Sequence, residues 1–427
     1  MTVKEQAPPS SSDVQRLEER IAELEGKLEN VTQSAHNDIT HFKQQVMAGH
    51  SAYAKKTESH TKFIEGLSGA IDSHLKQDHR ALQHIFNYIG DRFDYMRMDP
   101  FDILIVGEGF EHVTGGLVSI RNYYRQSLEE KNIKVHLLPT KEINKWDAWI
   151  LSRKAKYLIV NSLGTLYQRS TFSLLDSFKE TWIYLHETDW TIRAFEEVDN
   201  IKYERFRKIA PKHGFLCVSK KQEQYLKDRF GITKTHVIGE CSAPFRIPPR
   251  EELIKKQKAN QPANILMIGS IQRRKGASFY SLTAEMAFKQ QKSWIFSWIG
   301  PGPVDNVYMS QGVKWLGVQK DEQLNRSLRE ADVFFLSSID DPFPLCVLEA
   351  IREGKRIVVY RDVGSTEIIE GLPGCAIYDE HTPEAALAAI DKVLSEEVDL
   401  DAYEEICQKY VDTKVFYHRI NEVLGLE

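Results

Sequence analysis

The sequence of 427 residues lacks long apolar runs and has no strong excess of charge of either sign. No stretch approaches the roughly 20 apolar residues that a membrane-spanning helix needs, so we expect no transmembrane segment. The formal net charge of −5 gives no reason to expect a nucleic acid as the partner. Hydrophobic residues make up 42% and charged residues 27%, which is typical of a globular protein and argues against wholesale disorder.

Cysteine is scarce, and the five cysteines form no CxxC pair and no Cys/His metal spacing. They are odd in number and far apart, at Cys217, Cys241, Cys346, Cys375 and Cys407. Buried thiols in a reducing compartment explain this pattern better than a disulfide framework does. The opening residues, MTVKEQAPPSSSD, contain no apolar core of the signal-peptide type. We therefore expect a cytoplasmic protein, and peripheral contact with a membrane stays open.

Proline is absent from residues 13–96, and this segment differs in kind from the rest. Its first part has apolar residues at alternating steps of three and four, namely Val14, Leu17, Ile21, Leu24, Leu28 and Val31. Charged residues flank this seam, so we predict a disordered stretch over 1–12 and then a helical coiled coil over 13–98 that forms a homo-oligomer. A helical hairpin packed on the rest of the chain is the alternative. Seven histidines fall here, but no two lie three or four apart, as a helical metal site requires.

From Phe101 onward the pattern changes to short apolar runs that alternate with helical segments. Apolar strands that are each followed by an amphipathic helix are typical of parallel sheets covered on both faces. The first series has strands predicted at 101–107, 134–139, 156–162, 181–187, 214–219 and 235–240. The second series, after a linker rich in Pro and Lys at 246–262, has strands predicted at 264–270, 294–300, 313–317, 332–338, 356–362 and 375–379.

The sequence thus predicts an α/β fold with two Rossmann-like, doubly wound domains behind the coiled coil. The first domain spans 101–245 and the second spans 263–399. Residues 400–427 are predicted to form helices that pack back across the domains. Ligands of doubly wound folds bind at the carboxyl ends of the strands, which predicts a site between the two domains.

Two carboxylates bracket the turn between the strand at 332–338 and the helix that follows it. Asp341 lies in the turn, and Glu349 lies on the helix. The free backbone N–H groups around Leu345 and Cys346, at the start of that helix, form an anion site suited to a diphosphate. Carboxylates beside such a site can accept hydrogen bonds from sugar and ribose hydroxyls.

The stretch DPFPLCVLE at 341–349 resembles the Glu-(seven residues)-Glu signature of the retaining GT-B glycosyltransferases, family 4 in particular. The resemblance implies that Asp341, which stands where the family usually has glutamate, contacts the donor sugar. It implies that Glu349 holds the donor ribose. Further donor contacts are implied for the residues between them, at Phe343, Pro344, Leu345 and Cys346.

A second match, GSIQRRKG at 269–276, follows the strand at 264–270. In the family a similar stretch supplies an arginine and a lysine to the donor diphosphate. Lys275 stands at the matching offset, but Ser270 replaces the arginine. Either Arg273 or Arg274 can take its place, and Arg274 is favoured because it is adjacent to Lys275. A diphosphate leaving group develops negative charge, and fixed cations lower that barrier.

Three weaker matches complete the resemblance. The glycine pair that opens the helix after the first strand resembles a place where backbone approaches donor phosphate or acceptor. His186, at the end of the strand at 181–187, resembles a histidine that lies near the reacting sugar. The third match suggests loops around the donor base. The glycine pair is Gly115 and Gly116, and the residues of the base loops are Gly300, Gly317 and Val318.

The resemblance covers residues 101–427 and implies sugar transfer from a nucleotide-diphosphate donor to a hydroxyl acceptor, with retention at the anomeric carbon. It implies that the first domain lies on the acceptor side and the second domain on the nucleotide-sugar donor side, and that the leaving phosphate helps to deprotonate the acceptor. It implies a growing glycan or glycolipid as the acceptor, and neither a metal nor another cofactor is expected. The DxD string at 399–401 is interpreted as surface or a helix cap. Catalytic roles are implied for His186, Asp341, Lys275 and Arg274. Two alternatives stay open: a GT-B nucleotide-sugar epimerase, and a non-catalytic coiled-coil scaffold with a vestigial fold.

Overall fold

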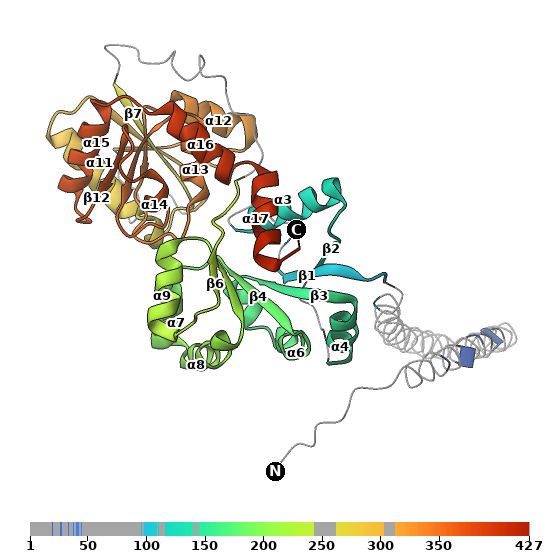
Figure 1. Ribbon diagram of the computed structural model, residues 1–427. Coiled ribbons are helices and arrows are strands. Elements are labelled where there is room, and N and C mark those ends of the chain that lie inside the picture. The colour runs from blue at the N-terminus through green and yellow to red at the C-terminus, as the bar shows by residue number, and fades with distance from the viewer. Residues whose placement is uncertain are drawn as a thin grey trace, which may run out of the picture. The chain divides into compact units, whose positions relative to one another are not determined.

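The computed structural model describes residues 98–108, 110, 116–139, 143, 145–242, 262–302 and 312–426, together with Tyr95 and isolated positions between residues 19 and 44. The chain divides into two compact units, Met1–Asp91 and Arg92–Glu427. The predicted coiled coil and the predicted linker lie almost entirely outside the described residues, so both stay predictions. The second unit holds both sheets that the described residues form (Figure 1).

The first sheet has six parallel strands in the order β2-β1-β3-β4-β5-β6. They are β1 (Phe101–Gly107), β2 (Val135–Pro139), β3 (Ala155–Asn161), β4 (Glu180–Leu185), β5 (Gly214–Cys217) and β6 (Thr235–Val237). The helices are α3 (Leu117–Glu130), α4 (Lys145–Lys154), α5 (Leu163–Leu166), α6 (Arg169–Ser177), α7 (Asp189–Val198), α8 (Asn200–Ile209), the 3-10 helix η1 (Ala210–Lys212) and α9 (Lys220–Phe230). Consecutive residues of β1 and β3 are buried, so both faces of this sheet are covered.

The second sheet also has six parallel strands, in the order β12-β11-β10-β7-β8-β9. They are β7 (Ala263–Ile268), β8 (Trp294–Ile299), β9 (Val313–Trp315), β10 (Val333–Leu336), β11 (Arg356–Tyr360) and β12 (Cys375–Tyr378). The helices are the 3-10 helix η2 (Arg273–Lys275), α11 (Ala277–Lys289), α12 (Asp321–Glu330), α13 (Leu345–Arg352), α14 (Thr366–Ile369) and α15 (Pro383–Leu394). On one face of the sheet α11 packs against α15, and α13 packs against α16 (Leu400–Tyr410) on the other (Figure 1).

The twelve predicted strands are confirmed, and each begins within one residue of its predicted start. Both sheets are doubly wound, because the strand order reverses next to the first strand of each sheet. In the first sheet the reversal lies between β1 and β3, and in the second it lies between β7 and β10. A reversal opens a crevice at the carboxyl ends of the two neighbouring strands. In the second sheet, the loops after β7 and β10 therefore occupy the position where ligands of this fold class bind.

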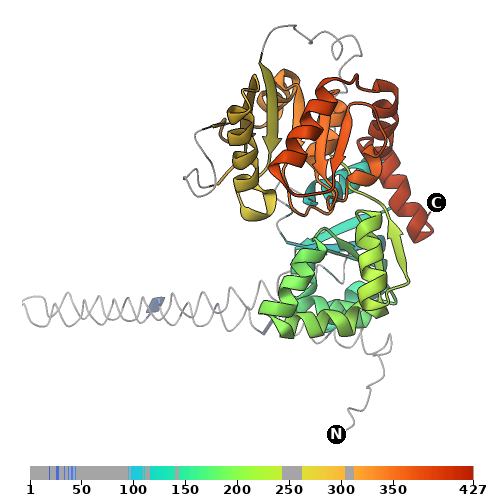
Figure 2. The same ribbon diagram turned by 90° about the vertical axis from the view of Figure 1, so that its left-hand side faces the viewer.

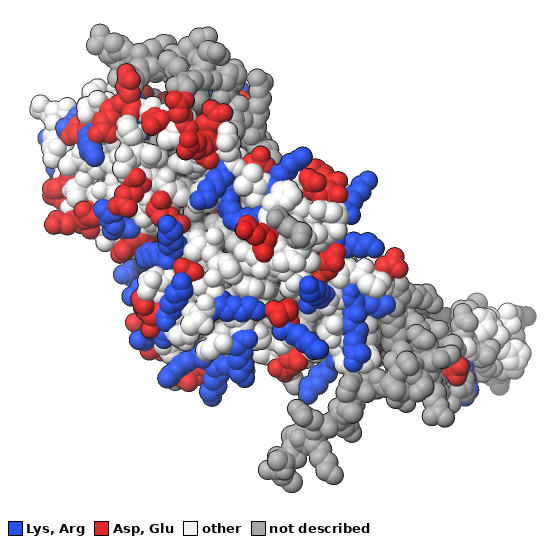
Figure 3. All heavy atoms as spheres, in the orientation of Figure 1, with Lys and Arg blue, Asp and Glu red and all other residues white. Residues whose placement is uncertain are grey.

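The two sheets form separate groups in Figure 2, where the first is coloured cyan to green and the second yellow to red. On the face drawn in Figure 3, Lys and Arg are frequent over the first group, and Asp and Glu are frequent over the second. Charges of both signs are nevertheless interspersed, so this face carries no uniform basic surface of the kind that binds a nucleic acid. Among the described helices, none has the length and apolar character needed to cross a bilayer.

The last helix of the chain, α17 (Thr413–Leu424), lies beside α3 of the first sheet's domain (Figure 1). The buried Tyr123 hydroxyl on α3 donates a hydrogen bond of 2.7 Å to Asn421 Oδ1 on α17. The Thr413 hydroxyl donates to Gln126 Oε1 at 2.9 Å. Since α16 packs on α13, the two final helices connect the second domain back to the first.

Candidate functional site

The loops after β7 and β10 bring three charged side chains together at the carboxyl edge of the second sheet. The Lys275 ammonium forms an ion pair with the Asp341 carboxylate, which is buried. Arg274 Nη1 lies 3.6 Å from the same carboxylate oxygen and donates a hydrogen bond of 3.0 Å to the backbone carbonyl of Asp340. Two cations thus face one carboxylate, which leaves a positively charged surface for an anion.

Backbone contacts hold these two loops against each other. Gly276 has a φ of +69°, and a Cβ at this position would lie 2.0 Å from the carbonyl oxygen of Ser337. Only glycine therefore lets the chain pass this close to the end of β10. The Ser337 hydroxyl donates to the Lys275 carbonyl at 2.9 Å, and the backbone N–H of Ile339 donates to the Arg274 carbonyl at 3.0 Å. These bonds fix the two cations relative to the turn at 340–344.

A second glycine fixes the turn at 340–344 from the side of β11. A Cβ on Gly364 would lie 1.7 Å from the Pro342 carbonyl oxygen, so the two turns are in direct backbone contact. The Gly364 N–H donates to the Asp341 carbonyl at 2.8 Å. Helix α13 begins directly after Pro344, which provides no side-chain cap. The N–H groups of Leu345 and Cys346 are consequently available to an anion, whereas that of Val347 donates to the Pro344 carbonyl at 3.0 Å.

Glu349, in the middle of α13, is half-buried, and no hydrogen bond or ion pair joins its carboxylate to another described side chain. Burial raises the pKa of this carboxyl to about 7 from a usual value of 4.5, although the charge of Arg352 opposes the shift. A carboxyl that is desolvated without a protein donor is suited to accept hydrogen bonds from a ligand's hydroxyls. The structure thus places Asp341 in the turn before α13 and Glu349 in the middle of that helix.

The four residues between Asp341 and Glu349 that were predicted to contact the donor differ in what they can contribute to binding. Burial raises the pKa of the half-buried Cys346 thiol to about 12, which argues against a nucleophilic role. Phe343 is buried and its ring centroid lies 5.5 Å from that of Tyr410 on α16, so this side chain belongs to the core. Pro344 and Leu345 contribute through the backbone at the start of α13.

Of the two arginines predicted as replacements for the one missing at Ser270, only Arg274 reaches the ion cluster. Arg273 is exposed, and its guanidinium forms no hydrogen bond or ion pair with another described residue. The Ser270 hydroxyl accepts a hydrogen bond of 2.7 Å from Gln272 Nε2. The loop after β7 thus presents Arg274 and Lys275 to the edge of the sheet.

The residues predicted to surround a donor base lie at the ends of β8 and β9. Gly300 has a φ of +146°, and a Cβ there would lie 1.9 Å from the Gly269 carbonyl oxygen. Its N–H donates to the Gly317 carbonyl at 2.9 Å. The next residue, Val318, is 55% exposed. The loops after β7, β8 and β9 are therefore joined in one layer, with an apolar side chain left open to solvent.

On the first sheet, His186 follows β4 and is bonded on both sides of its ring. Its Nδ1 lies 2.8 Å from Glu240 Oε1, and its Nε2 lies 2.7 Å from Asn161 Oδ1. The Ser119 hydroxyl donates to the other oxygen of Glu240 at 2.8 Å. A Cβ on Gly116 would lie 2.0 Å from His186 Nδ1, so this glycine makes room for the ring. Gly115, its predicted companion, lies outside the described residues.

Two residues of this region were not singled out from the sequence. Glu240 ends the stretch predicted as a strand at 235–240, and its position after a strand was the available signal. Lys221, on α9, contacts loops of the second domain, and no motif near Lys221 in the sequence predicts this contact.

No cluster of three or more His, Cys, Asp or Glu side chains that could hold a metal is found in the described part of the chain. The DxD string at 399–401 begins at the N-cap of α16, where Asp399 accepts hydrogen bonds from two backbone N–H groups.

Comparisons with known proteins agree with this architecture. Residues 249–411 match the family model for glycosyl transferases group 1. A sucrose-phosphate synthase from Thermosynechococcus elongatus matches with 12% identity and a TM-score of 0.58, over 77% of this chain and 98% of that one. HepE from Anabaena, in complex with UDP and glucose, matches with 14% identity and a TM-score of 0.56, over 76% of this chain and 99% of that one. A structure described as trehalose-6-phosphate from E. coli bound with UDP-2-fluoro glucose matches with 12% identity and a TM-score of 0.53, over 76% and 98%.

No curated protein matches the sequence of this chain. The identities to the solved structures are low, so these likenesses define the fold. The chain has two parallel-sheet α/β domains that match GT-B structures, and residues 249–411 match the model of the glycosyl transferases group 1. Together these findings support a GT-B glycosyltransferase.

Proposed function

We propose that this protein transfers a sugar from a nucleoside-diphosphate donor to a hydroxyl acceptor, with retention of the anomeric configuration. The observation that carries the proposal is the arrangement at the switch point of the second sheet. Two cations, an uncapped helix start and a carboxyl that forms no hydrogen bond or ion pair with another described side chain lie together there. This set of groups fits a diphosphate and the hydroxyls on either side of it.

The chemistry follows from the charge that develops on the donor. When the bond between the sugar and the diphosphate breaks, negative charge accumulates on the leaving phosphate, and Lys275, Arg274 and the N–H groups of α13 stabilise it. Before the donor binds, the Asp341 carboxylate forms an ion pair with the Lys275 ammonium. A diphosphate therefore competes with Asp341 for the ammonium, and the displaced carboxylate becomes free to accept a hydrogen bond from the donor sugar. Glu349 accepts hydrogen bonds from the ribose.

His186 enters this proposal as a structural residue rather than as a base. Both of its ring nitrogens are engaged by Glu240 and Asn161, so no nitrogen is left to take a proton from an acceptor hydroxyl. The leaving phosphate, as the resemblance implies, takes that proton. We therefore propose that His186 fixes the end of β4 and takes no part in proton transfer.

The donor that we propose for the first test is UDP-glucose. The support comes from similar folds, because HepE from Anabaena is in complex with UDP and glucose and the E. coli structure is bound with UDP-2-fluoro glucose. We propose a growing glycan or a glycolipid as the acceptor. A homo-oligomer formed through residues 13–98, a cytoplasmic location and catalysis without a metal or another cofactor belong to the same proposal.

A thermal-shift panel with UDP, GDP, ADP and UDP-glucose tests the donor site directly. A ligand at 100 times its dissociation constant adds about 2.7 kcal/mol to the stability of the state that binds it. We expect one nucleotide series to stabilise the wild type and to have little effect on Glu349→Ala and Lys275→Ala. Lys289→Ala, at the opposite end of α11, is the matched control and should respond like the wild type.

Product analysis then separates the proposed transferase from its alternatives. A glycosylated acceptor with the anomeric configuration of the donor, seen by NMR, supports the proposal. Free or rearranged sugar without such a product favours an epimerase. If no nucleotide stabilises the folded wild type, the donor site is wrong and a non-catalytic scaffold becomes the better explanation.

A further inference from the structure

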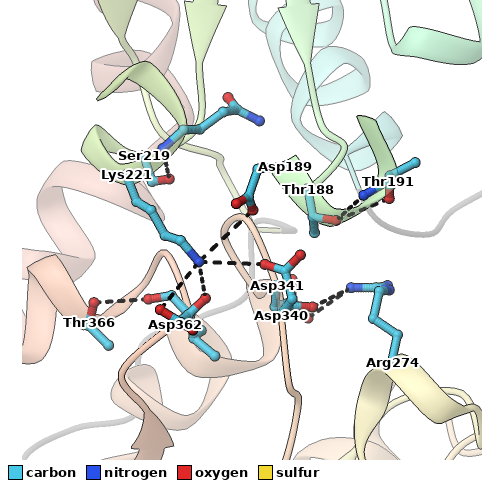
Figure 4. A network of polar contacts seen from close by, with 12 residues as sticks. Thr188, Asp189, Thr191, Ser219, Lys221, Arg274, Asp340, Asp341, Asp362 and Thr366 are labelled. Carbon is cyan, nitrogen blue, oxygen red and sulfur yellow. Dashed lines mark hydrogen bonds and ion pairs between the residues drawn. The ribbon is translucent and has the colours of Figure 1, made fainter. Parts of the chain in front are cut away.

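A lysine from the first domain is surrounded by carboxylates from both domains (Figure 4). Lys221 lies in the first turn of α9, after β5 of the first sheet. Its ammonium donates a hydrogen bond of 2.6 Å to the backbone carbonyl of Asp362, which follows β11. It also lies 3.8 Å from the Asp362 carboxylate, 3.7 Å from that of Asp340 and 4.0 Å from that of Asp189.

One ammonium thus compensates several negative charges. Asp189, which begins α7 of the first domain, also pairs with Arg193 at 2.6 Å. Asp340 is buried, and burial together with the charge of Asp189 raises the pKa of Asp340. Without Lys221, the carboxylates of Asp189, Asp340 and Asp362 would repel one another across the two domains. The lysine thus offsets the repulsion between these loops.

The same loops are part of the proposed donor site. Asp340 immediately precedes Asp341, and its backbone carbonyl accepts the hydrogen bond from Arg274. Asp362 is two residues from Gly364, whose N–H donates to the Asp341 carbonyl and whose backbone lies directly against the Pro342 carbonyl. Asp340 and Asp362 are therefore joined to Asp341 by short stretches of backbone and by direct backbone contacts.

Helix α9 makes a second contact with this region that does not depend on the lysine side chain. The backbone N–H of Lys220 donates a hydrogen bond of 2.8 Å to Glu367 Oε2, on α14. The Ser219 hydroxyl lies close to Gly364, where an added Cβ would be 2.9 Å away. The start of α9 is thus in contact with the turn at 362–367 at several points, and Lys221 extends this contact to Asp340.

We propose that Lys221 is a positioning residue, which holds the turn at 340–344 in register with the first domain through Asp340 and Asp362. This inference rests on the proposed function, because its purpose is to align a donor sugar on Asp341 with an acceptor bound by the first domain. The lysine touches no reacting atom. Lys221 affects the position of the turn at 340–344 and not the charge of the groups that bind the diphosphate.

Hydrogen–deuterium exchange of the full chain tests the positioning without any substrate. Lys221→Met keeps an unbranched side chain that is one atom shorter and removes its charge. We expect the amides of 339–347 and 362–368 to exchange about tenfold faster in this variant, because local opening becomes easier. Lys220→Met is the matched control, since the interdomain bond of Lys220 comes from its backbone. Unchanged exchange in both segments of Lys221→Met overturns the proposal.

A second substitution covers the case in which Lys221→Met fails to fold. The Asp362 carboxylate is 58% exposed, so Asp362→Asn is compatible with folding, and it removes one of the contacts of Lys221. It should accelerate exchange in the same two segments by a smaller factor. Acceleration restricted to other segments of the chain would contradict the positioning role.

Steady-state kinetics with UDP-glucose, or with the nucleotide sugar that the thermal-shift panel selects, gives the second readout. Misplacing a reacting group costs about 10- to 100-fold in rate, so we expect kcat of Lys221→Met to fall by this factor. The dissociation constant of the free nucleotide should stay close to the wild-type value, and Lys221→Arg should recover most of the rate. A variant that turns over like Lys220→Met overturns the proposal. If the wild type turns over no donor, the proposed function fails, and the exchange experiment still decides whether Lys221 positions the turn.

Discussion

The carboxyl edges of the two parallel sheets carry ionisable side chains in different states. At the edge of the second sheet, Lys275 and Arg274 share Asp341, and the Glu349 carboxyl has no partner among the described side chains. At the edge of the first sheet, His186 is bonded on both sides of its ring. Buried polar groups that are satisfied within the protein stabilise the fold, whereas those with an exchangeable partner or none can bind a ligand. On the proposed function, the edge of the second sheet binds the nucleotide donor, and the bonded histidine at the edge of the first sheet stabilises the fold.

The comparison is tested most strongly at Lys275. Removing one fixed charge that stabilises a developing anion costs roughly 10²–10³ in rate, and we expect Lys275→Met to lower kcat by this amount. Arg274→Met should have the next largest effect, and Arg273→Met the smallest, because Arg273 lies away from the ion cluster. Steady-state rates with the selected nucleotide sugar measure the series. A larger loss for Arg273 than for Arg274 would reverse the assignment of the two arginines.

A substitution at the edge of the first sheet should change the stability of the protein and not its catalytic rate. Glu240→Gln disturbs the hydrogen bonds that Glu240 forms with His186 and Ser119 and should lower the free energy of unfolding by about 1–3 kcal/mol. The affinity for nucleotide should remain near the wild-type value, because Glu240 belongs to the other sheet. Urea denaturation and nucleotide titration measure the two quantities. Full stability combined with loss of turnover would show that the edge of the first sheet takes part in the chemistry.

The pKa of Glu349 predicts opposite effects of pH on the fold and on the ligand. In the unfolded chain this carboxyl ionises near 4.5, while the folded chain holds its proton up to about 7. The free energy of unfolding should therefore fall as the pH rises from about 4.5 to about 7 and stay level above, by at most about 3 kcal/mol. Nucleotide affinity should rise over the upper part of that range, because ribose hydroxyls donate to the ionised form.

Glu349→Gln provides the control for both effects of pH. Its amide does not titrate, so the contribution of this position to both pH profiles should disappear. Calorimetry at pH 6 and pH 8 measures the affinity, and denaturation over the same range measures the stability. If the variant keeps the wild-type dependence of affinity on pH, another group governs donor binding.

The smallest effect is expected at Cys346, where the backbone and the side chain can be separated. Its thiol has a pKa of about 12 and should react slowly with iodoacetamide at pH 8. Cys346→Ser keeps the N–H at the start of α13, so nucleotide affinity should change by less than about twofold, or about 0.5 kcal/mol. A large loss of affinity would mean that the sulfur itself contacts the ligand.

The fold was accessible from the sequence because burial on both faces leaves a local signal. The run at 103–106, for example, is apolar at every position, and the structure buries all four residues. The DPFPLCVLE stretch likewise predicted a turn followed by a helix, with Asp341 in the turn and Glu349 on α13. Each of these features depends on residues that are near one another in the chain, which is why the periodicity and the motif could reveal them.

The partners of the charged side chains could not be predicted in the same way. Glu240 is 54 residues from His186, and its carboxylate is directed at the ring by the packing of separate elements. Lys275 and Asp341 are 66 residues apart and meet because β7 and β10 are neighbours in the sheet. Lys221 meets Asp340 only because of the arrangement of two domains. Such pairings are set by tertiary structure, which a local pattern does not contain.

The pairing of α17 with α3 has a consequence for the synthesis of the protein. Tyr123 and its partner Asn421 are 298 residues apart, so a ribosome adding about 5–20 residues per second needs roughly 15–60 seconds to supply the second after the first. During this interval the side of α3 that α17 later covers stays open to water and to other chains. Completion of the first domain thus waits for the translation of the second, and a chaperone that shields α3 would act in that interval.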